Sequence, residues 1–209
     1  MVKRRRDGHH GGVSTYGYAK PGAAAVAVYE DDEPLEGVRR QFDEGMMMSL
    51  TEPLSVLDIA QAFLERLGKM STYKLQKLCF YAQAQHLAWY STRLFHEPIE
   101  AWPNGPAVRA LYAAHATKRD VSELKEGVAQ AVADSPVAAE TVDFVAAQYG
   151  RWDGNHLKEL THREEPWLAA REGLLPGEHS RREIAAEVIR DYYRRVTCGD
   201  LSDEVVEGE

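Results

Sequence analysis

The strongest constraint on the fold is a long helical pattern that begins near Leu75. Apolar side chains recur there at steps of three and four residues, which places them along one stripe of an α-helix. The stripe contains Leu75, Leu78, Cys79, Ala82, His86 and Trp89, and Phe80, Ala84, Leu87 and Ala88 widen it. A helix that is apolar around so much of its circumference must be covered on several sides. The pattern predicts a mainly α fold, a compact multi-helix bundle around this long central helix.

Helix start and stop signals flank this segment. Ser55 with Asp58 predicts a capping box, and Gly68 predicts the end of that helix. Further along, Ser135-Pro136 opens a helix that Gly150 ends, and Asp153 caps a short one. We expect Pro166 to start the next helix. Ser180 and Glu183 predict a capping box before a closing helix that carries Ile184 and Val188.

The region around residues 94–108 is less regular. Residues 94–102 are short, apolar and interrupted by Pro98, which predicts a short strand or extended connection, and a small β-hairpin fits here. Asn104-Gly105-Pro106 predicts a turn, with Pro106 at the first position of a helix. Val108, Leu111, Tyr112 and His115 would continue that helix.

Composition divides the chain into three parts. Residues 1–50 lack a sustained period, so we predict a disordered extension. It is either a regulatory arm or the result of a start site misassigned ahead of Met46, Met47 and Met48. Residues 51–198 form the predicted folded domain. Residues 199–209 hold five acids and no base, a large share of the net charge of −8, and we expect this acidic tail to be disordered. The folded part is close to neutral.

The sequence favours a cytoplasmic protein that does not enter membranes. No apolar run is long enough to cross a bilayer, and the basic residues 3–6 are not followed by the apolar stretch of a signal peptide. The two cysteines lack the spacing of a disulfide framework or a metal site. Cys79 lies inside the helical stripe, so we interpret it as a small buried apolar residue.

Catalytic signatures are absent from the sequence. It contains no nucleophile elbow, dinucleotide-binding loop, phosphate loop or zinc-protease motif, and we expect no cofactor, no metal and no enzyme. Two alternatives stay open. His162 and Glu165, three residues apart, could serve a small hydrolase, and the basic residues 3–6 could serve a DNA-binding autoregulator. No basic recognition helix accompanies that patch, so we do not expect nucleic acid as a partner.

Two separated signatures resemble the Panacea domain of SocA- and GepA-like antitoxins. The first runs from Leu75 to Tyr112, from LQKLCFYAQAQHLAWY to EAWPNGPAVRALY, and the second is LTHREEPW at 160–167. The family usually has Val directly after Gly-Pro, whereas Ala107 intervenes before Val108 here. The resemblance extends over about 54–196. Residues 1–50 and the acidic tail have no counterpart in it.

The resemblance implies a helical antitoxin of a toxin–antitoxin system that binds a cognate toxin protein encoded by a neighbouring gene. It also implies that one branch delivers its toxin to a cytosolic protease. We predict a partner-binding surface or shared scaffold made by the residues of the two signatures. These are Trp102, Gly105, Pro106, Arg109, Tyr112, Thr161, His162 and Trp167. Toxin choice would then depend on variable surface positions outside this set.

Overall fold

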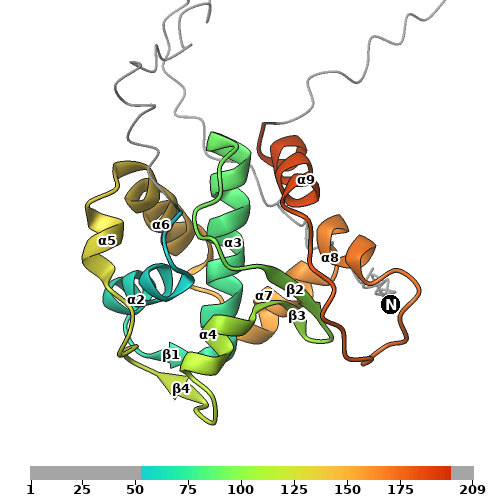
Figure 1. Ribbon diagram of the computed structural model, residues 1–209, viewed down its shortest axis with the longest axis horizontal. Coiled ribbons are helices and arrows are strands. Elements are labelled where there is room, and N and C mark those ends of the chain that lie inside the picture. Colours follow the sequence, from blue (N-terminus) through green and yellow to red (C-terminus); the bar gives the residue numbers. More distant parts are fainter. Residues whose placement is uncertain (1–52, 199–209) are drawn as a thin grey trace, which may run out of the picture.

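The computed structural model describes residues 53–198, and the predictions for residues 1–50 and 199–209 lie outside this range. Within it the chain forms eight helices and two sheets of two strands each (Figure 1). The mainly α class is therefore confirmed. No helix among residues 53–198 combines the length and apolar character that a bilayer span requires.

In chain order the elements are α2 (Val56–Leu67), β1 (Met70–Ser71), α3 (Thr72–Tyr90), β2 (Ile99–Trp102), β3 (Gly105–Val108), α4 (Arg109–Ala114), β4 (Asp120–Val121), α5 (Ala129–Ala133), α6 (Pro136–Tyr149), α7 (Gly154–Thr161), α8 (Glu165–Ala170) and α9 (Ala186–Cys198).

Helix α3 packs against α2, α6, α7 and α9 and against the strand β3 (Figure 1). Its apolar stripe is buried: Leu75, Leu78, Cys79 and Ala82 are fully inaccessible. His86 is buried too, and its ring nitrogens form hydrogen bonds with the hydroxyls of Thr141 and Thr92. Polar side chains on the same helix are buried as well, and these shape the site described below.

Most of the predicted helix signals are confirmed. Ser55 and Asp58 form a complete capping box at α2, and Gly68 ends that helix with a positive φ of 75°. The side chain of Asp153 accepts from the His156 backbone at the start of α7. Pro136 and Pro166 lie in the first turns of α6 and α8, where a missing N–H costs nothing.

Two boundaries differ from the prediction. Pro106 does not begin a helix but lies in β3, paired with Ala101, so the hairpin spans 99–108 and α4 begins only at Arg109. Its missing N–H is tolerated because this ladder has only two strands. The closing helix begins at Ala186, and Glu183 is extended, opposite Glu100 in an isolated bridge.

The segment before α9 covers the outer edge of β2. The Ala101 N–H donates to the Arg182 carbonyl over 2.8 Å, and the Ile184 N–H donates to the Ile99 carbonyl over 2.8 Å. Backbone pairing at an open strand edge therefore replaced the capping box at Ser180, because unpaired edge groups next to the core must find partners.

Candidate functional site

The eight residues predicted from the two signatures lie around the β2–β3 hairpin. Trp102 and Gly105 face each other across the hairpin turn, and Arg109 and Tyr112 follow on α4. Thr161 and His162 end α7, and Trp167 lies on α8. The structure thus brings one group of residues together from two segments about sixty positions apart.

Glu100 organises the exposed side of the hairpin. Its carboxylate accepts from Arg109 Nε at 3.0 Å, from Arg109 Nη2 at 2.6 Å, and from the Trp102 indole at 2.6 Å. Burial acts to raise the pKa of Glu100, but the hydrogen bonds from Arg109 and Trp102 outweigh it and hold the pKa below its usual value. The guanidinium of Arg109 also lies over the Trp102 ring, 5.9 Å from its centroid. Arg109 is therefore fixed by a two-pronged ion pair.

Trp167 connects the second signature to the hairpin. Its indole N–H donates to the Trp102 carbonyl over 3.0 Å, and the His162 ring stacks on it with centroids 4.0 Å apart. Burial lowers the pKa of His162, and Lys158 and Lys77 act in the same direction. Arg171 also lies over the Trp167 ring, 5.4 Å from its centroid, and donates to the Ala101 carbonyl at 2.9 Å. These contacts fix α8 against β2.

Gly105 lies at the tightest point of the site. Its φ of 96° is a conformation that glycine adopts without strain. A Cβ atom there would be 2.5 Å from Lys77 Nζ and 2.8 Å from Thr161 Oγ1. Thr161 is fully buried, and its hydroxyl donates to the Lys158 carbonyl within its own helix. Gly105 is therefore required both for the turn and for the close approach of α3 and α7.

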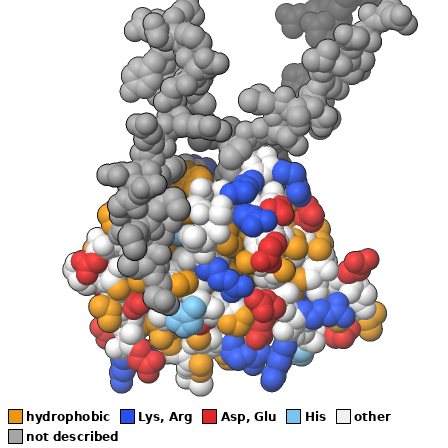
Figure 2. Space-filling view, turned by 45° about the horizontal axis from the view of Figure 1, so that its top comes forward, with side chains coloured by type: hydrophobic (Ala, Val, Ile, Leu, Met, Phe, Trp, Pro, Cys, Tyr) orange, Lys and Arg blue, Asp and Glu red, His pale blue; other side chains and the backbone are white. Residues whose placement is uncertain are grey.

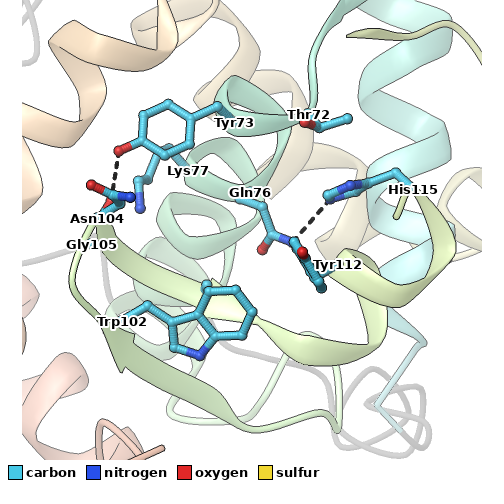
Figure 3. A pocket seen from close by; sticks show the side chains of 10 residues that line it. Thr72, Tyr73, Gln76, Lys77, Trp102, Asn104, Gly105, Tyr112 and His115 are labelled. Carbon is cyan, nitrogen blue, oxygen red and sulfur yellow. Dashed lines mark hydrogen bonds between the residues drawn. The ribbon is translucent and has the colours of Figure 1, made fainter. Parts of the chain in front are cut away.

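A cavity of about 170 Å³ lies between the start of α3, the hairpin and α4 (Figure 3). Two of the predicted aromatic residues, Trp102 and Tyr112, form part of its wall, with their rings 5.2 Å apart and tilted edge to face. Its lining is Thr72, Tyr73, Gln76, Lys77, Trp102, Asn104, Gly105, Ala107, Tyr112 and His115.

Lys77 is the unusual member of this lining. The residue is only 1% exposed, and its ammonium donates to the Pro106 carbonyl at 2.9 Å. Among residues 53–198 no carboxylate lies within ion-pair distance of it. Burial lowers the pKa of Lys77 to about 7, and the neighbouring charge of Lys158 acts in the same direction. The cavity thus has a buried lysine without a counterion at its wall.

Gln76 fixes the junction between β3 and α4. Its side-chain oxygen accepts from the Val108 N–H at 2.8 Å, and its nitrogen donates to the Val108 carbonyl at 3.2 Å. That nitrogen lies 3.2 Å from His115 Nε2. Because the amide orientation is set by Val108, His115 Nε2 must accept, so the imidazole is neutral, and burial lowers the pKa of His115.

Sequence reasoning missed Gln76, Lys77 and Tyr73. Each lies beside the apolar stripe of α3, at positions that a one-sided helix would leave in solvent. The available signal was the surrounding sequence: apolar residues surround Gln76 and Lys77, so little of that helix surface is left to face water.

The alternative hydrolase pair is not assembled. The His162 ring stacks on Trp167, and its Nε2 atom is buried without a hydrogen-bond partner. Glu165 forms an ion pair with Arg195 on α9. Within residues 53–198 no group of three or more His, Cys, Asp or Glu side chains is placed to hold a metal ion. The basic residues 3–6 of the DNA-binding alternative lie outside the described residues.

The family comparison matches the region that contains both signatures. The model described as antitoxin SocA-like, Panacea domain, matches residues 75–168. The resemblance inferred from the sequence is confirmed for this segment, which is similar to SocA-like Panacea domains. Residues 54–74 and 169–196, to which we extended the resemblance, lie outside the match. Neither a curated protein nor a solved structure matches the chain.

Proposed function

We propose that this protein is the antitoxin of a toxin–antitoxin pair and neutralises its cognate toxin in the cytoplasm by direct, stoichiometric binding. The observation that carries the proposal is the match to the SocA-like antitoxin domain over residues 75–168, which includes all eight candidate site residues. A family of antitoxins implies a toxin as partner.

The contacts of the eight residues divide them into two groups. Gly105, Pro106 and Thr161 are buried, and Trp102, Trp167 and His162 connect α8 to the hairpin, so these six support the fold. Tyr112 is 49% exposed, and the Arg109 side chain is 45% exposed. Tyrosine and arginine are the side chains that contribute most often to the binding energy of protein interfaces. We therefore assign Arg109 and Tyr112 to the toxin-binding surface.

The charge distribution supports a protein partner. On the face shown in Figure 2, basic and acidic side chains lie interspersed among hydrophobic ones. A nucleic-acid surface needs basic groups gathered on one side. A stable protein interface buries about 1,600 Å² in total, so it must extend well beyond two residues.

Co-expression tests the proposal. The adjacent gene product is expressed alone and together with this protein, and growth and co-purification are measured. We expect growth arrest by the neighbour alone, rescue on co-expression, and a complex that survives purification. Tyr112→Ala should weaken both rescue and co-purification, while Val128→Ala, which truncates an exposed residue at the start of α5, should not. A harmless neighbour, or rescue without a complex, would contradict direct neutralisation.

Delivery of the toxin to a cytosolic protease is a second form of the same function, which the family resemblance implies. The two forms differ in what happens to the toxin. Stoichiometric blocking leaves the toxin concentration constant in co-expressing cells, whereas delivery shortens its half-life. A time course of toxin abundance after synthesis is stopped separates them.

A further inference from the structure

The cavity beside α3 is lined mostly by carbon surface, with one cation in its wall. Trp102, Tyr112 and Tyr73 contribute aromatic rings (Figure 3), and the small residues Ala107 and Gly105 also line the cavity. An apolar cavity of about 150 Å³ is large enough to hold a benzene ring. The cavity volume of about 170 Å³ therefore suits one small ring with a short substituent.

The polar groups of the lining are nearly all engaged within the protein. The Tyr73 hydroxyl donates to the Asn104 carbonyl at 2.9 Å, and both hydrogen-bonding atoms of the Gln76 amide are used on Val108 and His115. Lys77 differs, because an ammonium has three N–H donors and only the Pro106 carbonyl accepts from it among the described residues.

The charges around Lys77 favour an anion. Lys158 of α7 is the charged group that acts on Lys77, and it has the same sign. Glu159 of the same helix acts on Tyr73 and His162 but forms no ion pair with Lys77. A buried charge normally has an opposite charge beside it, because desolvation is otherwise uncompensated. The described part of the chain does not supply that opposite charge.

The number of charges restricts the anion. One ammonium compensates one negative charge, whereas a phosphate monoester carries close to two at neutral pH and needs several donors. A carboxylate is a flat monoanion, and its aromatic or aliphatic body would fill the apolar part of the cavity. A phosphate would leave charge unpaired against Trp102 and Ala107.

We propose that this cavity binds a carboxylate carried on a small flat apolar group, with the carboxylate on Lys77 Nζ and the body against the rings of Trp102 and Tyr112. The carboxylate either belongs to a free small molecule or is presented by a bound protein partner. This inference does not depend on the antitoxin role, because it is tested on the isolated full chain.

Benzoate is a suitable probe, and benzamide is its neutral counterpart of the same shape. Calorimetric titration of the full-length protein should give saturable, one-to-one binding of benzoate and at least tenfold weaker binding of benzamide. Lys77→Met should weaken benzoate at least tenfold, whereas Lys125→Met, which alters an exposed lysine outside the cavity, should leave it unchanged. The benzoate and benzamide comparison needs no variant, so it remains decisive if Lys77→Met does not fold.

NMR of the lysine ε-carbons provides a second readout. Benzoate should shift the Lys77 resonance and raise the pKa at which it titrates, because a bound anion favours the ammonium. Equal binding of benzoate and benzamide, undiminished binding to folded Lys77→Met, or no binding of benzoate, phenylacetate or 4-hydroxybenzoate would overturn the proposal.

A competition experiment identifies the source of the carboxylate. If a co-purified toxin displaces benzoate, the partner places its own carboxylate in the cavity. If toxin and benzoate bind together, the natural ligand is a free molecule. Failure of toxin binding would not affect the benzoate titration, so the two proposals fail separately.

Discussion

The indole of Trp167 donates its N–H to the carbonyl of Trp102 over 3.0 Å, so one hydrogen bond joins the two separated sequence signatures. Trp167→Phe keeps a stacking ring for His162 but removes the donor. We expect a loss of about 1 kcal/mol in the free energy of unfolding, the usual net value of one such bond. Urea denaturation followed by far-UV circular dichroism measures it.

Trp152→Phe is the matched control for this substitution. Trp152 also stacks on a histidine, His156, at a centroid distance of 4.0 Å. The Trp152→Phe variant should lose only part of its stacking energy and be destabilised less than the Trp167→Phe variant. If both variants lose the same stability, the bond between Trp167 and Trp102 contributes nothing of its own.

Gln76→Ala should be among the more destabilising substitutions in the chain. It leaves the buried N–H and carbonyl of Val108 without their partners, at about 1–3 kcal/mol for each unpaired group. The change is read from the midpoint of chemical denaturation. Gln130→Ala, on the exposed side of α5, should change stability by less than about 0.5 kcal/mol. A Gln76 variant as stable as the Gln130 variant would show that water replaces the lost bonds.

Lys77 should make stability depend on pH in the alkaline range. Its pKa is about 7 in the folded protein and 10.5 in the unfolded chain, so between these values the unfolded state binds more protons. The free energy of unfolding should therefore rise with pH from about 7 to 10. Below pH 7 the folded protein bears the full cost of burying the charged ammonium. Lys77→Met should remove this rise and be more stable at pH 6 by a few kcal/mol, on the order expected for a buried uncompensated charge.

Denaturation curves of the wild type and Lys77→Met at pH 6, 8 and 10 measure this difference. Lys125→Met serves as the exposed control and should keep the wild-type pH dependence. Parallel pH profiles for wild type and Lys77→Met would mean that Lys77 is not held at a lowered pKa.

Glu164 should make the stability of the protein fall as pH rises through the acid range, opposite to the effect of Lys77. Burial raises the pKa of Glu164 to about 7, although the hydroxyls of Tyr193 and Tyr81 donate to its carboxylate and act to lower it. Between 4.5 and 7 the folded state then binds more protons, so stability is greatest below 4.5 and falls as pH rises through 7. Glu164→Gln should flatten this fall. Glu123→Gln, at an exposed position, should not.

Helix positions were largely predictable from the sequence because their signals are local. Such signals act within one helical turn, and the local structure agrees with the pattern at Ser55, Gly68, Asp153 and Pro166. The prediction that Pro106 starts a helix was wrong for a physical reason, because a proline suits both a first helical turn and a short edge strand. Only pairing with Ala101, across the chain, decides between them.

The site was half predictable. Trp102, Gly105 and Tyr112 belong to the first signature, and the structure places all three on the cavity. Lys77 and Gln76 were not found because helical periodicity assigns polar residues to solvent. Their burial follows from α9, α7 and the hairpin covering α3 on further sides, which is tertiary information.

The central claim is that this protein binds its toxin directly, through a surface that includes Arg109 and Tyr112. The most direct measurement is light scattering coupled to size-exclusion chromatography on the purified protein mixed with the adjacent gene product. We predict one complex of defined stoichiometry, lost or strongly weakened with Tyr112→Ala and retained with Val128→Ala. Separate elution of two proteins that nevertheless suppress toxicity together in cells would contradict the account.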